Sequence, residues 1–222
     1  MASRFIWFLG SLLALLFCLI AETETANDTL EKMQIAGRKM LSKQFAVLHL
    51  PGKNIGGCSR IKFNNPEGVD AHCNFAPVFE ERNETKEENE TRRHSEWQLI
   101  HTALKPMLEE WKKKYGEKKC PEKLYLYTFN APDYDRNRTA YNLTCTQAIV
   151  YKIPKILKED GCDRTSIVVG FSQVRNHYKN DTLNGCELMK ENGIIEYNLN
   201  NGRSNKEDHC RLVAEIGVQN TG

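Results

Sequence analysis

Residues 123–130 read KLYLYTFN and residues 166–174 read SIVVGFSQV, and these two stretches decide the fold class. Tyrosine and leucine alternate in the first stretch, whereas the second is an apolar run typical of a buried strand. Between them, Thr144–Asp160 carries isoleucine and leucine at helical spacing, with Pro154 inside it and Gly161 after it. The order strand, helix, strand favours a parallel sheet covered by helices.

The same alternation extends outward on both sides. Strands are expected at Phe45–Leu50, Ser59–Phe63 and Ile194–Leu199, and a further strand near Cys73 stays open. Apolar residues at three- and four-residue steps predict helices at Thr29–Lys43, Glu96–Tyr115 (kinked at Pro106) and Thr182–Glu191, with a helical turn within Lys206–Ile216. The sum predicts a three-layer α/β/α sandwich with a mixed, mostly parallel sheet of five strands.

The N-terminal region indicates export. Residues 1–21 hold one positive residue, Arg4, then an apolar run and a cleavage site at Ala21, which is the pattern of a signal peptide. The run is too short to span a membrane and no second one follows, so we expect a secreted, extracellular protein without a membrane anchor. Residues 22–44 are then a helical extension and 45–222 one domain, within which 80–93 is an acidic, glycosylated loop.

Glycosylation motifs agree with export. Six N-x-[ST] sequons predict N-linked glycans at Asn27, Asn83, Asn89, Asn137, Asn142 and Asn180. The formal net charge is only +2. A long nucleic-acid channel usually brings a clear basic excess, and this composition has none.

The cysteine count is odd once the signal peptide is removed. Cys18 leaves with it, and seven of the eight cysteines remain in a chain expected to form disulfides. Cys145 is the natural unpaired one, because it lies among the candidate site residues. Proximity in sequence favours Cys58–Cys73 and Cys162–Cys186, leaving Cys120–Cys210, although sequence alone does not fix the connectivity.

Two expected helix starts carry candidate chemistry. Capping-box patterns begin at Ser95 and Thr144, which places His94 and Cys145 at helix N-termini. The helix dipole there favours anions such as thiolate and hydroxide. A catalytic zinc takes three protein ligands and keeps one position open for water, and histidine and cysteine are suitable ligands.

Ala131-Pro132-Asp133 follows the 123–130 strand and supplies the third candidate ligand. Zinc accepts a carboxylate such as that of Asp133, with Asp135 as the open alternative. Bound zinc lowers the pKa of its water to about 7. Glu96 would accept that proton and pass it to a ring nitrogen and to the leaving ammonia, which makes it the candidate catalytic residue.

His94-Ser95-Glu96, the Ala131-Pro132-Asp133 turn and Cys145 on a helix resemble the H-x-E…P-C-x-x-C signature of the cytidine deaminase superfamily. With its signal peptide and parallel last strand, the chain is most similar to a secreted AID/APOBEC-like deaminase over roughly residues 45–199. The resemblance implies Zn²⁺ bound by His94, Asp133 and Cys145, and a substrate that is a nucleoside or single-stranded nucleic acid carrying cytosine. A role in extracellular immune defence would follow.

The chain departs from that signature in two places. Asp133 stands where the signature has a cysteine, and twelve positions separate it from Cys145, against the short C-x-x-C spacing. One alternative is therefore a catalytically inactive member of the same fold that acts as a secreted binding or immune protein. Another is an unrelated disulfide-stapled module with Cys145 bridged. A third is a hydrolase that uses Cys145 as nucleophile and His94 as base.

Overall fold

The computed structural model describes residues 25–40, 45–52, 59–60, 73–77, 95–134, 143–174, 179–200, 203–204 and 210. Several sequence predictions fall elsewhere and lie outside the described residues. These are the signal peptide at 1–21, the loop at 80–93, Cys58, His94, Asp135, and the sequon residues Asn83, Asn89, Asn137 and Asn142.

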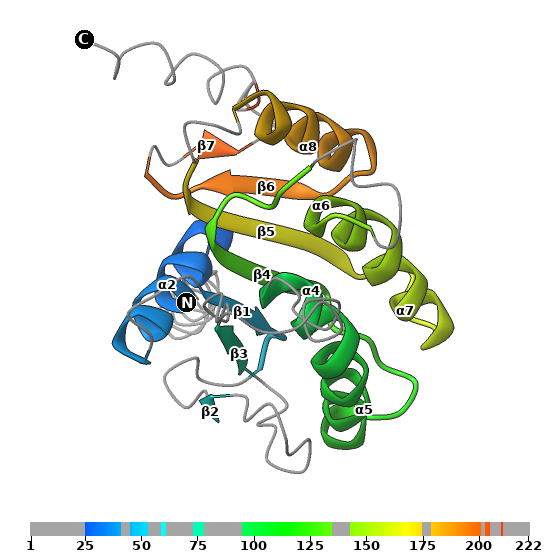
Figure 1. The fold of residues 1–222 in the computed structure, drawn as a ribbon. Helices are drawn as coiled ribbons and strands as arrows, with labels where there is room; N and C mark the ends of the chain where they lie inside the picture. The colour runs from blue at the N-terminus through cyan, green and yellow to red at the C-terminus, as the bar shows by residue number, and fades with distance from the viewer. Residues whose placement is uncertain are drawn as a thin grey trace, which may run out of the picture.

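A mixed sheet of seven strands forms the centre of the molecule (Figure 1). In space the strands follow the order β2 (Ser59–Arg60), β3 (Cys73–Pro77), β1 (Phe45–His49), β4 (Lys123–Asn130), β5 (Ser166–Gln173), β6 (Ile195–Asn198) and β7 (Arg203–Ser204). β4, β5 and β6 are parallel neighbours, and β2 is parallel to β3. β1 pairs antiparallel with β3 and β4, and β7 pairs antiparallel with β6.

The α/β class and the mixed sheet are confirmed, whereas the expected five strands are not. Parallel and antiparallel pairs are equally frequent, so the sheet is not mostly parallel either. β2 begins at Ser59, where the strand Ser59–Phe63 was expected, whereas β7 has only two residues, too few for any hydrophobic period to register in the sequence. The strand left open near Cys73 is present as β3. The crossover through α8 makes β5 and β6 parallel, as predicted.

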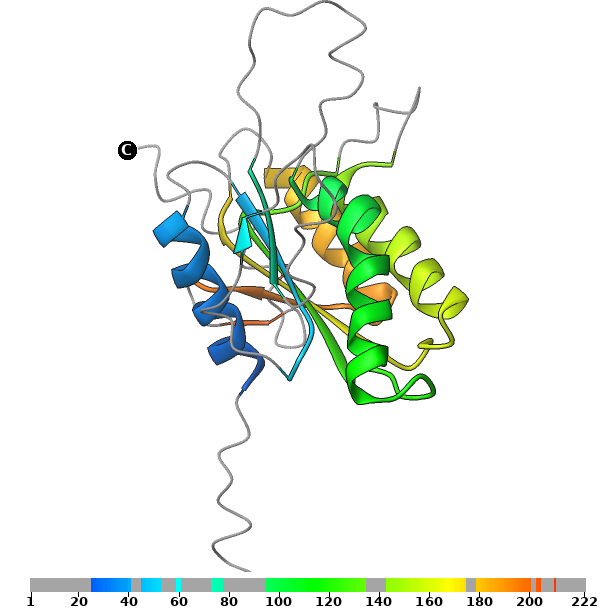
Figure 2. The same ribbon diagram turned by 90° about the horizontal axis from the view of Figure 1, so that it is seen from below.

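Helices lie against both faces of the sheet, because alternate strand side chains point to opposite faces. On one face, Leu30 and Met33 of α2 (Ala26–Met40) pack with Phe45 and Tyr127 of the strands. On the other face, the intervening strand residues pack against the helical segments between residues 95 and 159. Figure 2 shows blue α2 on one side of the sheet and the green, yellow and orange helices on the opposite side.

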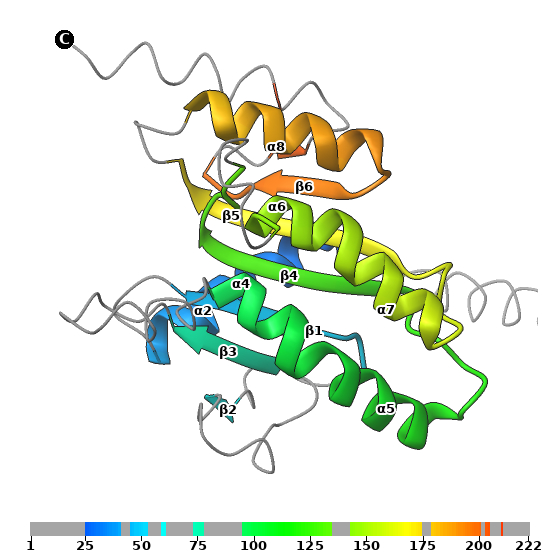
Figure 3. The same cartoon turned by 45° about the vertical axis from the view of Figure 1, so that its right-hand side comes forward.

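Two of the three long helices on the second face contain a π-helical turn. α4 (Ser95–Gln98) continues through η3 (Leu99–Ala103) into α5 (Leu104–Tyr115), and α6 (Cys145–Gln147) continues through η4 (Ala148–Lys152) into α7 (Ile153–Glu159). The two composite helices run side by side in Figure 3 and touch at their π turns.

A π-helical turn precedes the proline in each of these two helices. Pro106 lies in the first turn of α5, directly after η3, and Pro154 lies in the first turn of α7, directly after η4. Proline lacks an N–H and crowds the carbonyl four residues before it. A widened π turn ahead of the ring accommodates both problems, and such turns are frequent at functional sites.

The third long helix, α8 (Lys179–Glu191), joins β5 to β6 and begins three residues before the predicted start. Gly185 faces α6 at close range, because a Cβ there would lie 2.9 Å from Thr146 Oγ1. α8 therefore packs directly against the first turn of α6.

The described disulfides correct the predicted pairing. Cys120 bonds to Cys162, and Cys186 bonds to Cys210, so Cys162–Cys186 and Cys120–Cys210 are wrong. Cys120 precedes β4 and Cys162 precedes β5, and because these strands are adjacent and parallel, their entry loops meet at one edge of the sheet. Nearness along the chain was the wrong guide. The pair Cys58–Cys73 lies partly outside the described residues.

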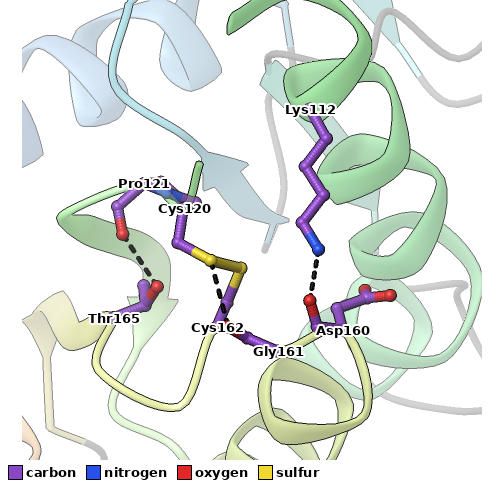
Figure 4. The surroundings of a disulfide bond; sticks show 7 residues. All are labelled: Lys112, Cys120, Pro121, Asp160, Gly161, Cys162 and Thr165. Carbon is purple, nitrogen blue, oxygen red and sulfur yellow. Dashed lines mark hydrogen bonds between the residues drawn. A yellow bond between two sulfur atoms is a disulfide. The ribbon is translucent and has the colours of Figure 1, made fainter. Parts of the chain in front are cut away.

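The Cys120–Cys162 bridge belongs to a small network that ties the two loops together (Figure 4). Thr165 Oγ1 donates a hydrogen bond of 2.7 Å to the carbonyl oxygen of Pro121, and Lys112 Nζ donates one to the carbonyl oxygen of Asp160. The network fixes the base of the β4–β5 pair, at the end opposite to the candidate site.

Two predicted glycosylation residues are described. Asn27 is half-buried in the first turn of α2, and Asn180 is exposed at the start of α8. Within the described residues, no helix combines the length and the apolar character needed to cross a membrane.

Candidate functional site

Glu96 is the centre of the candidate site and is 1% exposed. It lies in the first turn of α4, with its carboxylate turned toward the carboxyl end of β4. Thr128 Oγ1 of β4 donates a hydrogen bond to Oε1, and Ser95 Oγ donates one of 3.2 Å to Oε2. Open α/β sheets commonly bind ligands outside the carboxyl ends of their strands.

Cys145 approaches the same carboxylate from the second helix. Its Sγ donates a hydrogen bond to Glu96 Oε2 at 3.6 Å, and the side chain is 4% exposed. Thr144 forms the predicted capping box with Gln147, so Cys145 is the first residue of α6. It is the free cysteine of the described residues, as predicted, and this excludes the hypothesis in which it is bridged.

Asp133 joins the site as a helix cap. Its Oδ1 accepts a 2.9 Å hydrogen bond from the backbone N–H of Cys145, and its carbonyl oxygen accepts one of 3.1 Å from the backbone N–H of Thr146. Thr146 Oγ1 also donates to the carbonyl oxygen of Pro132. These bonds attach the end of β4 to the start of α6 across the long insertion, which explains how residues twelve positions apart share one site.

The electrostatics of the site oppose ionisation of the thiol. Burial raises the pKa of Cys145 well above its usual value, and the negative charges of Glu96 and Asp133 raise it further. The sequence suggested that the helix dipole would favour a thiolate here, but burial and two carboxylates outweigh it. A protonated, buried thiol is a poor nucleophile, which argues against the Cys/His hydrolase hypothesis.

Zinc fits the chemistry of these donors. A divalent cation beside Cys145 would cancel the two effects that raise its pKa, because it would pair with the thiolate and with the surrounding carboxylates. A catalytic zinc takes three protein ligands, so one more is needed in addition to Asp133 and Cys145. Glu96 does not supply it, because Glu96, Asp133 and Cys145 do not all bring ligand atoms within 4.8 Å of one another. His94, next to described Ser95, would have to supply it.

An aromatic pair lies on the same helix, beside the candidate site. The rings of Trp97 and His101 stack with centroids 3.6 Å apart, and Nδ1 of His101 lies 2.9 Å from the carbonyl oxygen of Trp97. The pair joins α4 to η3, so it rigidifies the turn that carries Glu96.

A second cysteine–carboxylate cluster lies between α8 and β6. Cys186, Glu196 and Cys210 place their ligand atoms within 4.8 Å of one another, which makes them the one such group of three among the described His, Cys, Asp and Glu residues. Burial raises the pKa of Glu196 to about 8. The sequence alone indicated the two cysteines only as half-cystines and did not single out Glu196.

Sequence analysis also missed the two hydroxyl partners of Glu96. Thr128 lies on the same face of β4 as the core residues Leu124 and Leu126. A polar residue on a buried strand face is a signal in the sequence that could have pointed to a functional site. Glu196 carries the same signal in β6, because its neighbours Ile195 and Tyr197 pack on the α2 face.

Comparisons of the sequence with models of known protein families and with curated proteins found no match.

Proposed function

We propose that this protein is a secreted, zinc-dependent deaminase-like enzyme with the three-layer sandwich of the cytidine deaminase superfamily. The reaction is hydrolytic deamination of a cytosine base, in a nucleoside or in a single-stranded nucleic acid, with release of ammonia. The observation that carries the proposal is the convergence of Glu96 and Cys145, from two helix starts, at the carboxyl end of β4. Extracellular immune defence is the role that such a secreted enzyme would serve.

The chain's own residues divide the work in this proposal. His94, Asp133 and Cys145 would hold Zn²⁺, which supplies a water of lowered pKa. Glu96 would be the proton carrier, accepting protons from the attacking water on its carboxylate and delivering one to the ring nitrogen of cytosine and one to the departing amino group. Ser95 and Thr128 orient the Glu96 carboxylate through its two oxygens. The buried surroundings exclude competing water.

The competing proposal is a catalytically inactive member of the same fold, acting as a secreted binding or immune protein. It is favoured by one feature of the site, which is that its side chains satisfy one another. The Cys145 thiol donates to Glu96, and Asp133 caps α6. Metal binding would have to break the hydrogen bond from the Cys145 thiol to Glu96, and Asp133 would have to bind the metal while keeping or losing its hydrogen bond with the Cys145 N–H.

Metal content together with a cytosine-to-uracil assay tests the proposal. The secreted wild-type protein should contain about one zinc per chain and convert cytidine or a single-stranded oligonucleotide. Glu96→Gln should abolish conversion while zinc is retained, whereas Glu110→Gln, an exposed carboxylate on α5, should change neither. Zinc-bound protein that is inactive on both substrates would favour the inactive alternative.

The unusual Asp133 ligand has a direct test of its own. Carboxylate is a harder ligand than thiolate, so Asp133→Cys should raise zinc retention during dialysis against a chelator. If the wild-type protein holds no zinc and Asp133→Cys does not restore it, the metal proposal is wrong.

Export is tested separately from chemistry. The full chain expressed in animal cells should appear in the medium, lack residues 1–21, and gain mobility on gels after N-glycosidase treatment. Retention inside the cells, or an unchanged mobility, would contradict the signal-peptide or the glycosylation prediction.

A further inference from the structure

We propose that Cys186, Cys210 and Glu196 form a redox-gated zinc site, closed while the two sulfurs are bonded and able to bind Zn²⁺ once the disulfide is reduced. The site is distinct from the candidate deaminase centre and does not depend on the proposed function. It would place a metal between α8, β6 and Cys210.

The geometry is that of a preassembled ligand set. Cys186 lies on α8, Glu196 lies on β6, and Cys210 follows β7 in the sequence, so two elements and a residue outside both meet at one point. Their ligand atoms all lie within 4.8 Å of one another, and all three residues are buried, with 0%, 1% and 5% exposure for Cys186, Glu196 and Cys210. The disulfide already holds the two sulfurs together beside Glu196, so only their separation after reduction is needed to form the ligand set.

The redox step balances with a dithiol as reductant. The dithiol gives two electrons and two protons to the Cys186–Cys210 bond, which opens to two thiols while the reductant closes to its own disulfide. The freed sulfurs then move apart to non-bonded contact at roughly 3.5–4 Å, the separation that two thiolates take around a zinc ion with Zn–S bonds of about 2.3 Å. Zinc binding releases the protons of the thiols and of the Glu196 carboxyl.

The donor chemistry favours zinc over calcium or magnesium. Two thiolates select a soft or borderline metal, and zinc also accepts one carboxylate oxygen in a tetrahedral set. The charges agree, since two thiolates and a carboxylate buried together need a divalent cation.

The other described disulfide provides an internal contrast. Cys120 and Cys162 also lie close together, yet no third His, Cys, Asp or Glu of the described chain completes a group with them within 4.8 Å. Reduction there yields two thiols without a carboxylate partner. The difference allows the role of Glu196 to be tested in a protein where both bonds are reduced.

The experiment titrates metal into the full secreted chain carrying Cys145→Ser, which removes the thiol of the candidate deaminase centre. The protein is reduced with a phosphine, which takes the oxygen of one water while the disulfide becomes two thiols. Zn²⁺ affinity is measured by competition with a chromophoric chelator, and Co²⁺ is used to record sulfur-to-metal charge-transfer absorption. Glu196→Gln and the exposed neighbour Glu187→Gln are compared in the same background.

We expect about one equivalent of Zn²⁺ in the reduced Cys145→Ser protein that the oxidised protein does not bind. Glu196→Gln should weaken it at least about tenfold, the loss that even an outer-shell partner causes, while Glu187→Gln leaves it unchanged. If reduction unfolds the chain, Zn²⁺ should restore the circular dichroism of the oxidised form. Equal affinity in the two glutamine variants, binding that survives Cys186→Ser, or no binding and no refolding would each overturn the proposal.

Discussion

Two buried clusters in this molecule bring a cysteine sulfur against a carboxyl group, and they are built differently. At Cys145 the sulfur is a free thiol that donates to Glu96, and two hydroxyl groups donate to the same carboxylate. At Cys186–Cys210 the sulfurs are bonded to each other, and burial raises the pKa of Glu196. Both glutamates are equally buried, at 1% exposure. Burial alone therefore does not define a site, and the donors around each carboxyl group decide what it can do.

The largest expected effect is on the pH dependence of stability and comes from Glu196. Its folded pKa of about 8 lies above the usual value of 4.5, so the carboxyl favours the folded state fully below about pH 4.5. That contribution is lost as the pH rises through about 8. Glu196→Gln should remove the loss, making the variant more stable than wild type near pH 9 by up to about 4–5 kcal/mol, the equivalent of the shift.

Urea unfolding of the oxidised protein at pH 4.5, 7 and 9 measures this effect. Glu187→Gln, whose side chain is exposed, is the matched control and should follow the wild-type pH dependence. If the free energy of unfolding of the wild-type protein stays constant between pH 5 and 9, the pKa of Glu196 is not raised and the prediction is wrong.

The second effect compares what the two disulfides and the free thiol of Cys145 contribute to the free energy of unfolding. Cys186→Ala/Cys210→Ala removes a bond between residues 24 positions apart, and Cys120→Ala/Cys162→Ala one between residues 42 apart. Loop entropy predicts losses of about 3–4 kcal/mol for each pair, slightly more for the longer loop. Cys145→Ala should cost less, since no bond is lost. Chemical denaturation gives the ranking, and a Cys145 variant as unstable as either pair would contradict it.

The third effect sharpens the description of Glu96 as a residue held by donors. Thr128→Val keeps the shape of the side chain and removes the hydroxyl that donates to Oε1. A buried carboxylate that loses a donor costs about 1–3 kcal/mol of unfolding free energy. Thr128→Ser should restore most of that stability because it restores the hydroxyl. Equal losses in both variants would mean that the methyl group of Thr128, through packing, matters more than its hydrogen bond.

The smallest effect separates the cap from the charge at Asp133. Asp133→Ala should cost about 1 kcal/mol because it removes the acceptor for the Cys145 N–H, whereas Asp133→Asn keeps an acceptor and should cost less. Both variants remove a negative charge that raises the Cys145 pKa. Alkylation of Cys145 should therefore begin at a lower pH in both, as measured by mass spectrometry across a pH series. An unchanged alkylation profile would assign the raised pKa of Cys145 to burial and Glu96, without a contribution from Asp133.

Much of the architecture was predictable because it rests on local patterns. The limits of β4, the parallel β5–β6 pair and the capping box at Thr144 follow from alternation, crossover length and cap chemistry, which act over a few neighbouring residues. The unpaired Cys145 followed from counting. The two-residue strand β7 and the π turns were not predictable, since two residues leave no hydrophobic period and the spacing of apolar residues does not mark a π turn.

The amino-acid sequence by itself determined the element order, the odd cysteine and the residue types near the two helix starts, because those depend on composition and short-range spacing. Only the tertiary structure decided which cysteines meet, that Thr128 donates to Glu96, and that Glu196 lies against a disulfide. The physical reason is that these contacts join residues from different elements, and their positions follow from how the strands are ordered in the sheet. The raised pKa of Cys145 likewise comes from burial and from charges that the fold assembles.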